Sequence, residues 1–363
     1  MLQYCTMRNL VYIPLLLMIF ASINIKAQDL SAYIDPRKDF FVFDSGLLTK
    51  VEHLPVGNYV VGYNHIGYVD NTGLLKVYYK GKSYELNETK PTVMQATKDF
   101  LVFVVNENLK VVHGGKKETL MPLVANYAFS DSIIAFQDRF DAFNVFYNGR
   151  LKEVEIKMPF NYKLSDNMIA YVNYNNIFRI YFHGEVLDIE NVPPLSYDAG
   201  NNILAYIDPY NIFVVFYKGQ YHEISTFSPK SYRTGTNMVA YTTRDNEFKV
   251  FYDGNTYDLM NQQPRAFQVN EDILYFIDQN GYLHVFYKGK DVILENFTPE
   301  NIILDNNILA YTDLDGKLKA FIEGEQRAVS QNRVDHRFRI DGRVIRFIEN
   351  TNQVFFYSNG TVY

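Results

Sequence analysis

The sequence has almost none of the residues that build disulfide-stabilised or Cys-rich metal domains. Its 363 residues include one Cys and no Trp. A single Cys excludes a disulfide framework and a Cys-rich zinc site. Hydrophobic residues make up 47% of the chain and charged residues 21%, which excludes a disordered or collagen-like protein. The aromatic share of 16% comes instead from 30 Tyr and 28 Phe.

Positive charge is also scarce, and it is not clustered. The formal net charge is −6, and residues 1–27 contain Arg8 and Lys26 but no carboxylate, so the remaining chain has a formal charge of −8. No run of Lys and Arg interrupts this acidic balance. Because an acidic surface repels phosphate backbones, we expect no nucleic-acid partner.

The N-terminus has the pattern of an export signal. Arg8 precedes an apolar run from Leu10 to Ala21 that is short for a membrane span, and a small residue follows at Ala27. We predict a signal peptide over residues 1–27 and a mature domain over residues 28–363. The alternative is a buried N-terminal helix or a membrane anchor. Cys5 lies before the apolar run, which does not fit a lipid-anchored lipoprotein.

The predicted mature chain contains neither Cys nor a second apolar stretch of membrane length. Export without disulfides is typical of a bacterial periplasm, so we expect a soluble periplasmic protein. The outer surface or secretion into the medium is the alternative location.

A 35-residue repeat runs through the whole predicted mature chain. Glycines that follow a short apolar-aromatic run recur with gaps of 33 to 36 residues, and clear copies read Val215-Phe-Tyr-Lys-Gly219 and Val285-Phe-Tyr-Lys-Gly289. A second landmark, such as Ile203-Leu-Ala-Tyr-Ile-Asp208, lies just upstream of each glycine. Ten copies are present, and their glycines are Gly46, Gly81, Gly114, Gly149, Gly184, Gly219, Gly254, Gly289, Gly324 and Gly360. The short 33-residue gap indicates a turn two residues shorter around Val105–Asn108.

Each copy has the pattern of short β-strands. Its apolar runs are rich in Val, Ile, Phe and Tyr, and turn residues such as Asp278-Gln-Asn-Gly281 separate them. The Asn-Gly, Lys-Gly or Asp-Gly pairs predict tight two-residue hairpins. A connection containing Pro, for example Ser228-Pro229, then leads to a weaker fourth strand.

Four antiparallel strands per copy make a small sheet with two apolar faces, which is stable only when its neighbours cover it. Stacking such sheets around an axis gives a β-propeller. The chain therefore resembles a divergent β-propeller over roughly residues 30–363, with an all-β fold of about ten 35-residue repeats. A single ring of eight to ten blades is favoured, and a ring of seven or eight blades with extra sheets, or two smaller rings, are alternatives. The chain near Leu30 would complete the last blade, whose copy stops at Tyr363.

The histidines and the repeated acidic residues are the residue types that could form a metal or catalytic site. His113 and His183 precede turn glycines, which predicts exposed hairpin tips, and His222-Glu223 lacks the second His of a zincin helix. A row of turn carboxylates offers either a calcium rim or turn-capping side chains. We expect capping, because Asn173 and Thr243 share the row, whose carboxylates are Asp35, Asp70, Asp138, Asp208, Asp278 and Asp313.

A row of aromatic residues aligns in the first predicted strand. We expect these side chains to pack between blades, and the alternative is a channel or rim that stacks sugars or anchors a protein. The row comprises Tyr33, Tyr68, Phe103, Phe136, Tyr171, Tyr206, Tyr241, Phe276 and Tyr311.

No nucleophile elbow, P-loop or dinucleotide fingerprint is present in the sequence. We therefore predict no catalytic, cofactor-binding or metal residues, no cofactor and no enzyme. The acidic, Asn- and Tyr-rich exported chain is similar to accessory subunits of outer-membrane machinery, such as the soluble periplasmic plug of the type 9 secretion translocon. That resemblance implies a periplasmic scaffold that docks onto an outer-membrane protein complex. A lectin-like carbohydrate-binding propeller is the alternative, and an exported hydrolase or lyase is a third hypothesis.

Overall fold

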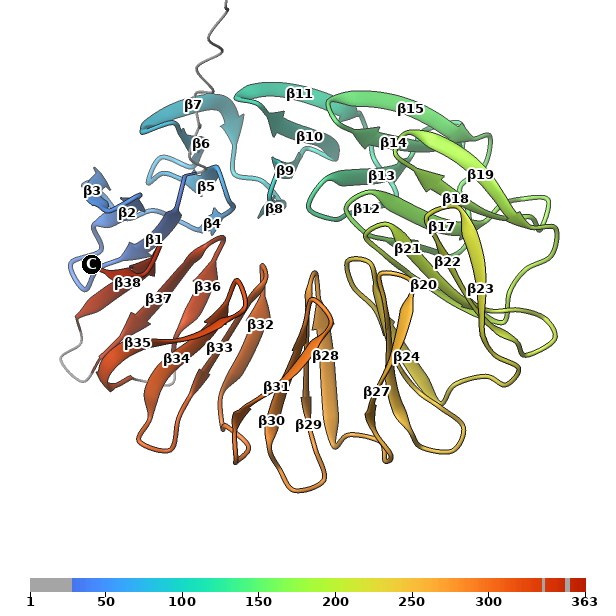
Figure 1. Cartoon of the computed structure of the whole chain (residues 1–363). Helices are drawn as coiled ribbons and strands as arrows, with labels where there is room; N and C mark the ends of the chain where they lie inside the picture. The colour runs from blue at the N-terminus through green and yellow to red at the C-terminus, as the bar shows by residue number, and fades with distance from the viewer. Residues whose placement is uncertain (1–27, 335–336, 350–352) are drawn as a thin grey trace, which may run out of the picture.

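In the computed structural model, which describes residues 28–334, 337–349 and 353–363, the chain forms one closed ring of ten β-sheets (Figure 1). All its regular elements in these ranges are strands, paired antiparallel with their neighbours. The blue first sheet lies beside the red last sheet, and the others follow in chain order (Figure 1). The predicted all-β propeller in a single ring is confirmed, with ten blades, and the two-ring alternative is wrong.

Blades 1 to 5 contain the following strands: in blade 1, β1 (Leu30–Ile34), β2 (Phe40–Asp44) and β3 (Leu47–Glu52); in blade 2, β4 (Tyr59–Val61), β5 (His65–Val69), β6 (Leu74–Tyr79) and β7 (Lys82–Thr89); in blade 3, β8 (Val93–Ala96), β9 (Phe100–Val105), β10 (Asn108–His113) and β11 (Lys116–Met121); in blade 4, β12 (Tyr127–Phe129), β13 (Ile133–Gln137), β14 (Phe143–Tyr147) and β15 (Arg150–Glu155); in blade 5, β16 (Tyr162–Leu164), β17 (Met168–Val172), β18 (Phe178–Phe182) and β19 (Glu185–Glu190).

Blades 6 to 10 continue the pattern: in blade 6, β20 (Ser196–Gly200), β21 (Ile203–Ile207), β22 (Phe213–Tyr217) and β23 (Gln220–Ser225); in blade 7, β24 (Ser231–Thr234), β25 (Met238–Thr242), β26 (Phe248–Tyr252) and β27 (Asn255–Met260); in blade 8, β28 (Ala266–Asn270), β29 (Ile273–Ile277), β30 (Leu283–Tyr287) and β31 (Lys290–Glu295); in blade 9, β32 (Ile302–Asp305), β33 (Ile308–Thr312), β34 (Lys317–Ile322) and β35 (Glu325–Arg333); in blade 10, β36 (Arg339–Asp341), β37 (Val344–Ile348), β38 (Val354–Ser358) and β39 (Thr361–Val362).

The weak strand after each Pro-containing connection belongs to the next blade, and its predicted place in the preceding sheet is wrong. Ser231–Thr234, which follows Pro229, pairs with Met238–Thr242 rather than with the sheet before it. It is the inner strand of its blade and lines the central cavity. The connection therefore runs from the outer edge of one sheet to the inner edge of the next.

The outer hairpins have the turn conformation that their sequences predict. In Lys218–Gly219 both residues have positive φ, at 50° and 77°, as a two-residue type I′ turn requires. In blade 3 this turn is Gly114–Gly115, so the ladder residue is Gly115, and His113 is the last residue of β10. The predicted equivalence of His113 and His183, which is itself a turn residue, is wrong.

Because the ladder residue is Gly115, the steps from Gly81 and to Gly149 are 34 residues each rather than 33 and 35. Blade 3 does have a shorter turn at the predicted place, but it is shorter by one residue rather than by two: four residues separate the paired Val104 and Leu109, and five separate Ile207 and Phe213. The other missing residue lies in the connection from blade 3 to blade 4.

Aromatic side chains hold neighbouring blades together. Phe178 of blade 5 packs between Tyr197 and Tyr206 of blade 6, with ring centroids 5.0 and 5.4 Å apart. The same three-ring contact recurs from blade to blade around Phe40, Phe143, Phe213 and Phe248. The predicted aromatic row supplies one ring of each contact and is buried from Tyr68 to Tyr311, which confirms its core role.

Several of these buried tyrosines also find a polar partner across the blade interface. The hydroxyl of Tyr206 donates a hydrogen bond to Glu190 of the preceding blade, at 2.9 Å. Tyr171 bonds to Glu155 and Tyr311 to Glu295 in the same way. A buried phenol needs such an acceptor, and in these copies a carboxylate of the preceding blade supplies it.

The ring closes by face-to-face packing of blade 1 on blade 10, without exchange of a strand, so the hypothesis that the chain near Leu30 completes the last blade is wrong. Among the described residues, blade 10 has four strands of its own and blade 1 has three. At this closing seam Phe43 stacks on Phe356 with a centroid distance of 4.6 Å. Ser31 donates a hydrogen bond to Asp341, at 2.6 Å, and Asp29 accepts one from Ser358, also at 2.6 Å.

Blades 10 and 2 cover the inner edge of blade 1. The hydroxyl of Tyr59 in blade 2 donates to the carbonyl oxygen of Ala32 in β1, at 3.1 Å. At the inner turns, a Cβ added to Gly342 of blade 10 would lie 3.4 Å from the carbonyl oxygen of Gly62 in blade 2. The inner turns of these two blades therefore lie within contact distance of each other.

We predict that Phe356→Ala opens the ring at its closing seam. Loss of a buried, stacked ring should lower the free energy of unfolding by about 3–5 kcal/mol. Urea unfolding measures this change, and limited proteolysis should show new cleavage in blades 1 and 10. Tyr84→Ala, at a half-exposed ring on the outer strand β7, is the control and should change stability by less than about 0.5 kcal/mol. Equal stability of Phe356→Ala and the parent would contradict closure by this contact.

Candidate functional site

A cavity of about 620 Å³ lies at the centre of the ring and is lined by the inner strands and inner turns of blades 2 to 10. Each inner turn has two residues, which connect the inner strand to the next strand of the same sheet, as Asn201–Asn202 does in blade 6. The residues at the first turn position differ from blade to blade. They are Tyr63, Lys98, Asp131, Asp166, Asn201, Thr236, Glu271, Asn306 and Gly342.

The inner turns are hydrogen-bonded to each other from blade to blade. The backbone N–H of Asp131 donates to Asp166 Oδ1 at 3.0 Å, and the N–H of Asp166 donates to Asn201 Oδ1 at 2.8 Å. The N–H of Thr236 bonds to the carbonyl oxygen of Glu271 at 2.7 Å. Backbone N–H groups of the inner turns thus form hydrogen bonds to the next blade, and these bonds stabilise the relative positions of neighbouring blades.

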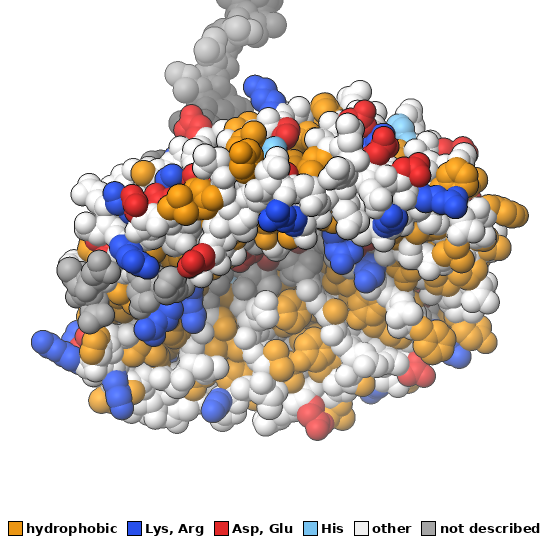
Figure 2. Space-filling model, turned by 90° about the horizontal axis from the view of Figure 1, so that it is seen from below, with side chains coloured by type: hydrophobic (Ala, Val, Ile, Leu, Met, Phe, Trp, Pro, Cys, Tyr) orange, Lys and Arg blue, Asp and Glu red, His pale blue; other side chains and the backbone are white. Residues whose placement is uncertain are grey.

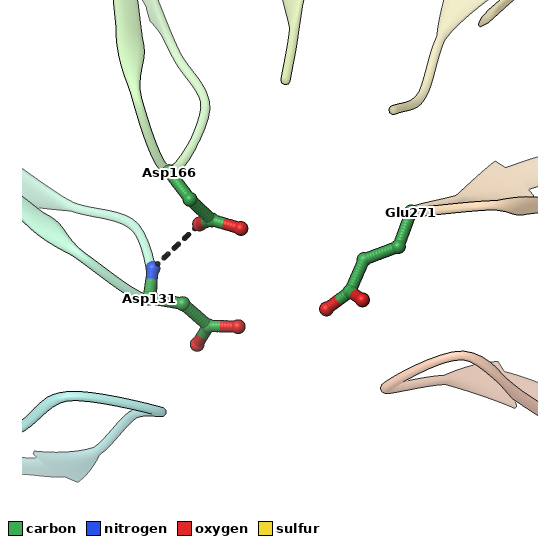
Figure 3. Close-up of side chains that lie close together, drawn as sticks. All are labelled: Asp131, Asp166 and Glu271. Carbon is green, nitrogen blue, oxygen red and sulfur yellow. Dashed lines mark hydrogen bonds between the residues drawn. The ribbon is translucent and has the colours of Figure 1, made fainter. Parts of the chain in front are cut away.

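Three carboxylates converge inside this ring of turns (Figure 3). Asp131 and Asp166 come from adjacent blades, and Glu271 points toward them from across the cavity (Figure 3). One oxygen of each lies within 4.8 Å of the others. Burial and the Asp166 carboxylate raise the pKa of Asp131 to about 6. Burial also raises the pKa of Glu271, although Lys98 opposes that shift.

Carboxylate oxygens are the ligands that Ca²⁺ and Mg²⁺ prefer, so these three residues are the ones that could hold a divalent cation. They supply three side chains, whereas Ca²⁺ takes about six to eight oxygen ligands. Serine and asparagine side chains of the cavity wall, such as Ser130, Ser165 and Asn201, are the other oxygen donors there.

This carboxylate cluster was not predicted from the sequence. The sequence does indicate it, however, because the three residues occupy equivalent positions of the repeat. Asp166 lies 35 residues after Asp131, and Glu271 lies 105 residues after Asp166, which is three repeats. The repeat therefore places all three at the same turn position, where other blades have Tyr, Lys, Asn, Thr or Gly. A search for carboxylates at one register position of the inner turns would have found them.

The predicted row of turn carboxylates lies elsewhere, between the second and third strands of each blade. Asp208 Oδ1 accepts the backbone N–H groups of Tyr210 and Ile212, both at 2.8 Å. Asn173 accepts the equivalent pair, and Thr243 accepts one N–H. Six carboxylates form the same contact, at Asp35, Asp70, Asp138, Asp208, Asp278 and Asp313. The capping interpretation is confirmed.

In two copies of this row, Asp70 and Asp278, the hydrogen bonds also lower the pKa of the carboxyl group. Burial acts to raise the pKa of Asp70, but hydrogen bonds from Thr72, Leu74 and Lys76 outweigh it and lower the pKa to about 2. The charged form of this side chain is therefore part of the turn.

Among the described residues, His65 and His113 line one pocket, and the other histidines lie apart from it. His183 occupies the predicted hairpin turn, and His222 lies on β23 against the ring of Phe251. His65 is buried at a position where the other nine blades have Leu, Phe, Ile, Met or Val. Burial lowers its pKa, so the imidazole is neutral in the core.

The two faces of the ring differ in their exposed side chains. One face, the hairpin face, carries the inner turns and the outer hairpins such as Lys218–Gly219. The opposite face, the connection face, carries the capped turns and the connections between blades. From blade 3 to blade 7 the connection face exposes an apolar arc: Leu123, Phe140, Ile156, Phe160, Tyr174, Val192, Leu195, Tyr210 and Phe227.

The arc covers one side of the molecule. Figure 2 shows hydrophobic side chains gathered on the right, where Figure 1 places the strands of blades 4 to 6. Phe160 is fully exposed, at 101%, and Tyr210 is 82% exposed. Contiguous exposed apolar side chains on one face typically mark an interaction surface.

Two grooves lie within the arc. The first has a volume of about 450 Å³ and lies between blades 4 and 6, with walls that include Pro159, Tyr174 and Pro194. The second has a volume of about 510 Å³ and is lined by Tyr210, Asn211, Thr226, Phe227, Ser228 and Arg244. Both open on the connection face. The described part of the chain contains no helix long and apolar enough to cross a membrane.

Comparison with known proteins identifies the architecture. Residues 24–363 match the family model described as a 10-bladed beta propeller domain. The match begins inside the predicted signal peptide, which itself lies outside the described residues and stays a prediction. No curated protein matches the chain.

Solved structures also match, at low identity. The computationally designed protein Ika8 is 15% identical, with a TM-score of 0.32 and coverage of 85% of this chain and 97% of that one. The CRINKLY WD40 ectodomain of the Arabidopsis thaliana receptor kinase ACR4 is 8% identical (TM-score 0.37; 66% and 97% covered). PorZ, a surface component of the type-IX secretion system of Porphyromonas gingivalis, is 10% identical (TM-score 0.31; 84% and 51% covered). Likeness at this level carries no functional information.

We predict that Asp131→Asn stabilises the protein at neutral pH. The pKa of Asp131 is raised from 3.8 to about 6 on folding, so the folded state binds this proton more tightly than the unfolded state. That contribution to stability is complete below about pH 4 and is lost as the pH rises through 6. Asp131→Asn should therefore gain about 1–2 kcal/mol at pH 8 and nothing at low pH.

Thermal unfolding at a series of pH values measures this difference. Asp245→Asn, at an exposed residue of the connection face, is the control and should follow the parent protein at every pH. A constant difference between Asp131→Asn and the parent across the pH range would contradict the assignment.

Proposed function

We propose that this chain, which belongs to the 10-bladed beta propeller family, is a non-catalytic interaction protein of the bacterial periplasm that docks onto an outer-membrane protein complex. The apolar arc on the connection face is the observation that carries this proposal. Nine large apolar side chains are exposed there on consecutive blades. Their contact with water is unfavourable in free energy, and a partner surface that covers them removes it.

The ring provides a rigid support for such a surface. The three-ring contacts between blades and the hydrogen bonds between inner turns hold the loops of the arc in fixed relative positions. A preformed surface loses little conformational entropy when it binds. This arrangement is suited to recognition of a folded partner.

The cellular compartment of the proposed partner follows from the predicted export signal. A protein that crosses the inner membrane without cysteines in its mature chain fits the periplasm, and its character resembles accessory subunits of outer-membrane machinery. The proposed partner is therefore an integral outer-membrane protein or its complex, as for the plug of a secretion channel.

Carbohydrate binding is the second candidate, and the groove at Tyr210 favours it. An exposed aromatic ring there is flanked by Asn211, Ser228 and Arg244, whose side chains can donate hydrogen bonds to hydroxyl groups. A flat ring beside polar side chains is a common arrangement for stacking a sugar.

We predict that the double variant Phe160→Ser/Tyr210→Ser loses its envelope partner. A tagged protein, purified from detergent-solubilised envelopes, should co-purify with an integral outer-membrane protein, and the variant should retain less than roughly a tenth of it. Both side chains are exposed, so thermal stability should not change. Ile293→Ser, at an exposed residue of the outer strand β31, is the matched control and should keep the partner.

Two results would count against docking. The first is a tagged protein that purifies alone, and the second is equal recovery of partner with the double variant. A glycan array distinguishes the second candidate, because sugar binding that disappears with Tyr210→Ser but survives Phe160→Ser would favour the lectin-like function.

A further inference from the structure

Three cations lie on the apolar arc without a carboxylate partner. Lys157 Nζ is 4.3 Å from the centre of the Tyr174 ring, the guanidinium of Arg139 is 4.7 Å from that of Phe140, and the guanidinium of Arg244 is 5.0 Å from that of Phe227. Among the described residues, none of these three cations forms an ion pair. Cations also lie over rings on the hairpin face, as Lys80 does over Tyr79, but these three lie on the arc itself, in a chain whose net charge is −6.

Two of these cations lie at the two grooves of the arc. Lys157 lines the first groove with Pro159 and Tyr174, and Arg244 lines the second with Tyr210 and Phe227. Each groove thus combines an apolar wall with one positive charge at a fixed place. A group that fits it has an apolar side chain next to a negative charge.

We infer that the partner contacts the arc with an acidic, apolar protein segment, in which carboxylates meet Lys157 and Arg244 while neighbouring aromatic or aliphatic side chains enter the two grooves. This inference rests on the proposed docking function and specifies the chemistry of its partner. Charge complementarity supports it, because each groove is lined by a cation and by no carboxylate.

The shape of the site favours a protein segment over a lipid surface. Pro159, Pro193 and Pro194 hold the walls of the first groove, and Met158 and Pro159 lie below the exposed surface. A membrane surface would be met by protruding tips with freely extending Lys and Arg side chains. Here the cations lie over aromatic rings, which fixes the place where a carboxylate can bind.

The test compares defined probes on the purified full chain. The probes are short immobilised peptides in which Asp or Glu alternates with Phe or Leu, the same peptides with Lys in place of the acids, and vesicles of phosphatidylglycerol. The variant is Lys157→Glu/Arg244→Glu. The control is Lys80→Glu, on the hairpin face, where Lys80 Nζ lies 5.1 Å from the centre of the Tyr79 ring and forms no ion pair among the described residues.

We expect the acidic peptides to bind, the Lys-substituted peptides not to bind, and the affinity to fall with added salt. Lys157→Glu/Arg244→Glu should weaken binding by roughly tenfold or more, and Lys80→Glu should leave it unchanged. The inference is overturned if no acidic peptide binds, if both peptide series bind equally, or if the charge-reversed variant binds as the parent does. Vesicle binding that the same charge reversal abolishes would also overturn it, since a lipid surface would then be the occupant.

Co-purification from envelopes with the charge-reversed variant separates this inference from the docking proposal. If Phe160→Ser/Tyr210→Ser loses the partner and Lys157→Glu/Arg244→Glu keeps it, docking through the arc stands and the acidic segment is wrong. If both variants keep the partner, both proposals fail. Loss with both variants supports both.

Discussion

The packing of one phenylalanine between two aromatic rings of the next blade is the contact on which the rest of this structure depends. A single four-stranded sheet exposes apolar side chains on both faces, and only the neighbouring sheets can cover them. The contact of Phe178 with Tyr197 and Tyr206 recurs at four more blade interfaces, around Phe40, Phe143, Phe213 and Phe248. In blades 2, 3, 8 and 9 a buried leucine takes the place of the phenylalanine: Leu75, Leu109, Leu283 and Leu318. Tyr and Phe supply all the rings of these contacts, so the absence of Trp is no obstacle.

The repeat made most of the fold predictable from the sequence. The glycine ladder gives the blade number, and the turn residues give the strand order, because the contacts that fix a blade lie within one copy. The assignment of the inner strand failed, since Ser231–Thr234 lies between two copies and its own sequence does not indicate which sheet it joins. Ring closure failed for a similar reason: the contacts of Ser31 with Asp341 join residues more than 300 positions apart, outside any repeat.

The candidate sites were less predictable than the fold. Asp131, Asp166 and Glu271 occupy ordinary turn positions, and only the closed ring brings them together. The apolar arc could not be predicted from the sequence for a different reason. Phe160 and Tyr210 look like core residues in a chain this rich in aromatics, and their exposure depends on how each connection leaves its sheet. Regular features of the repeat therefore indicate structure, while features confined to a few blades mark the surfaces that differ from the rest.

The closing seam also has a consequence for the order in which the molecule can be completed. Blade 1 is the first part of the ring to leave the ribosome or an export channel, and its covering neighbour, blade 10, is the last. Until blade 10 has been made, the surface of blade 1 that will contact it stays uncovered. Ser31 stands there, at a position where every other blade has Ile, Leu or Val, beside the charged Asp29. These polar groups favour hydration of the uncovered surface of blade 1. An incomplete ring is therefore less prone to associate with a second incomplete ring through this surface.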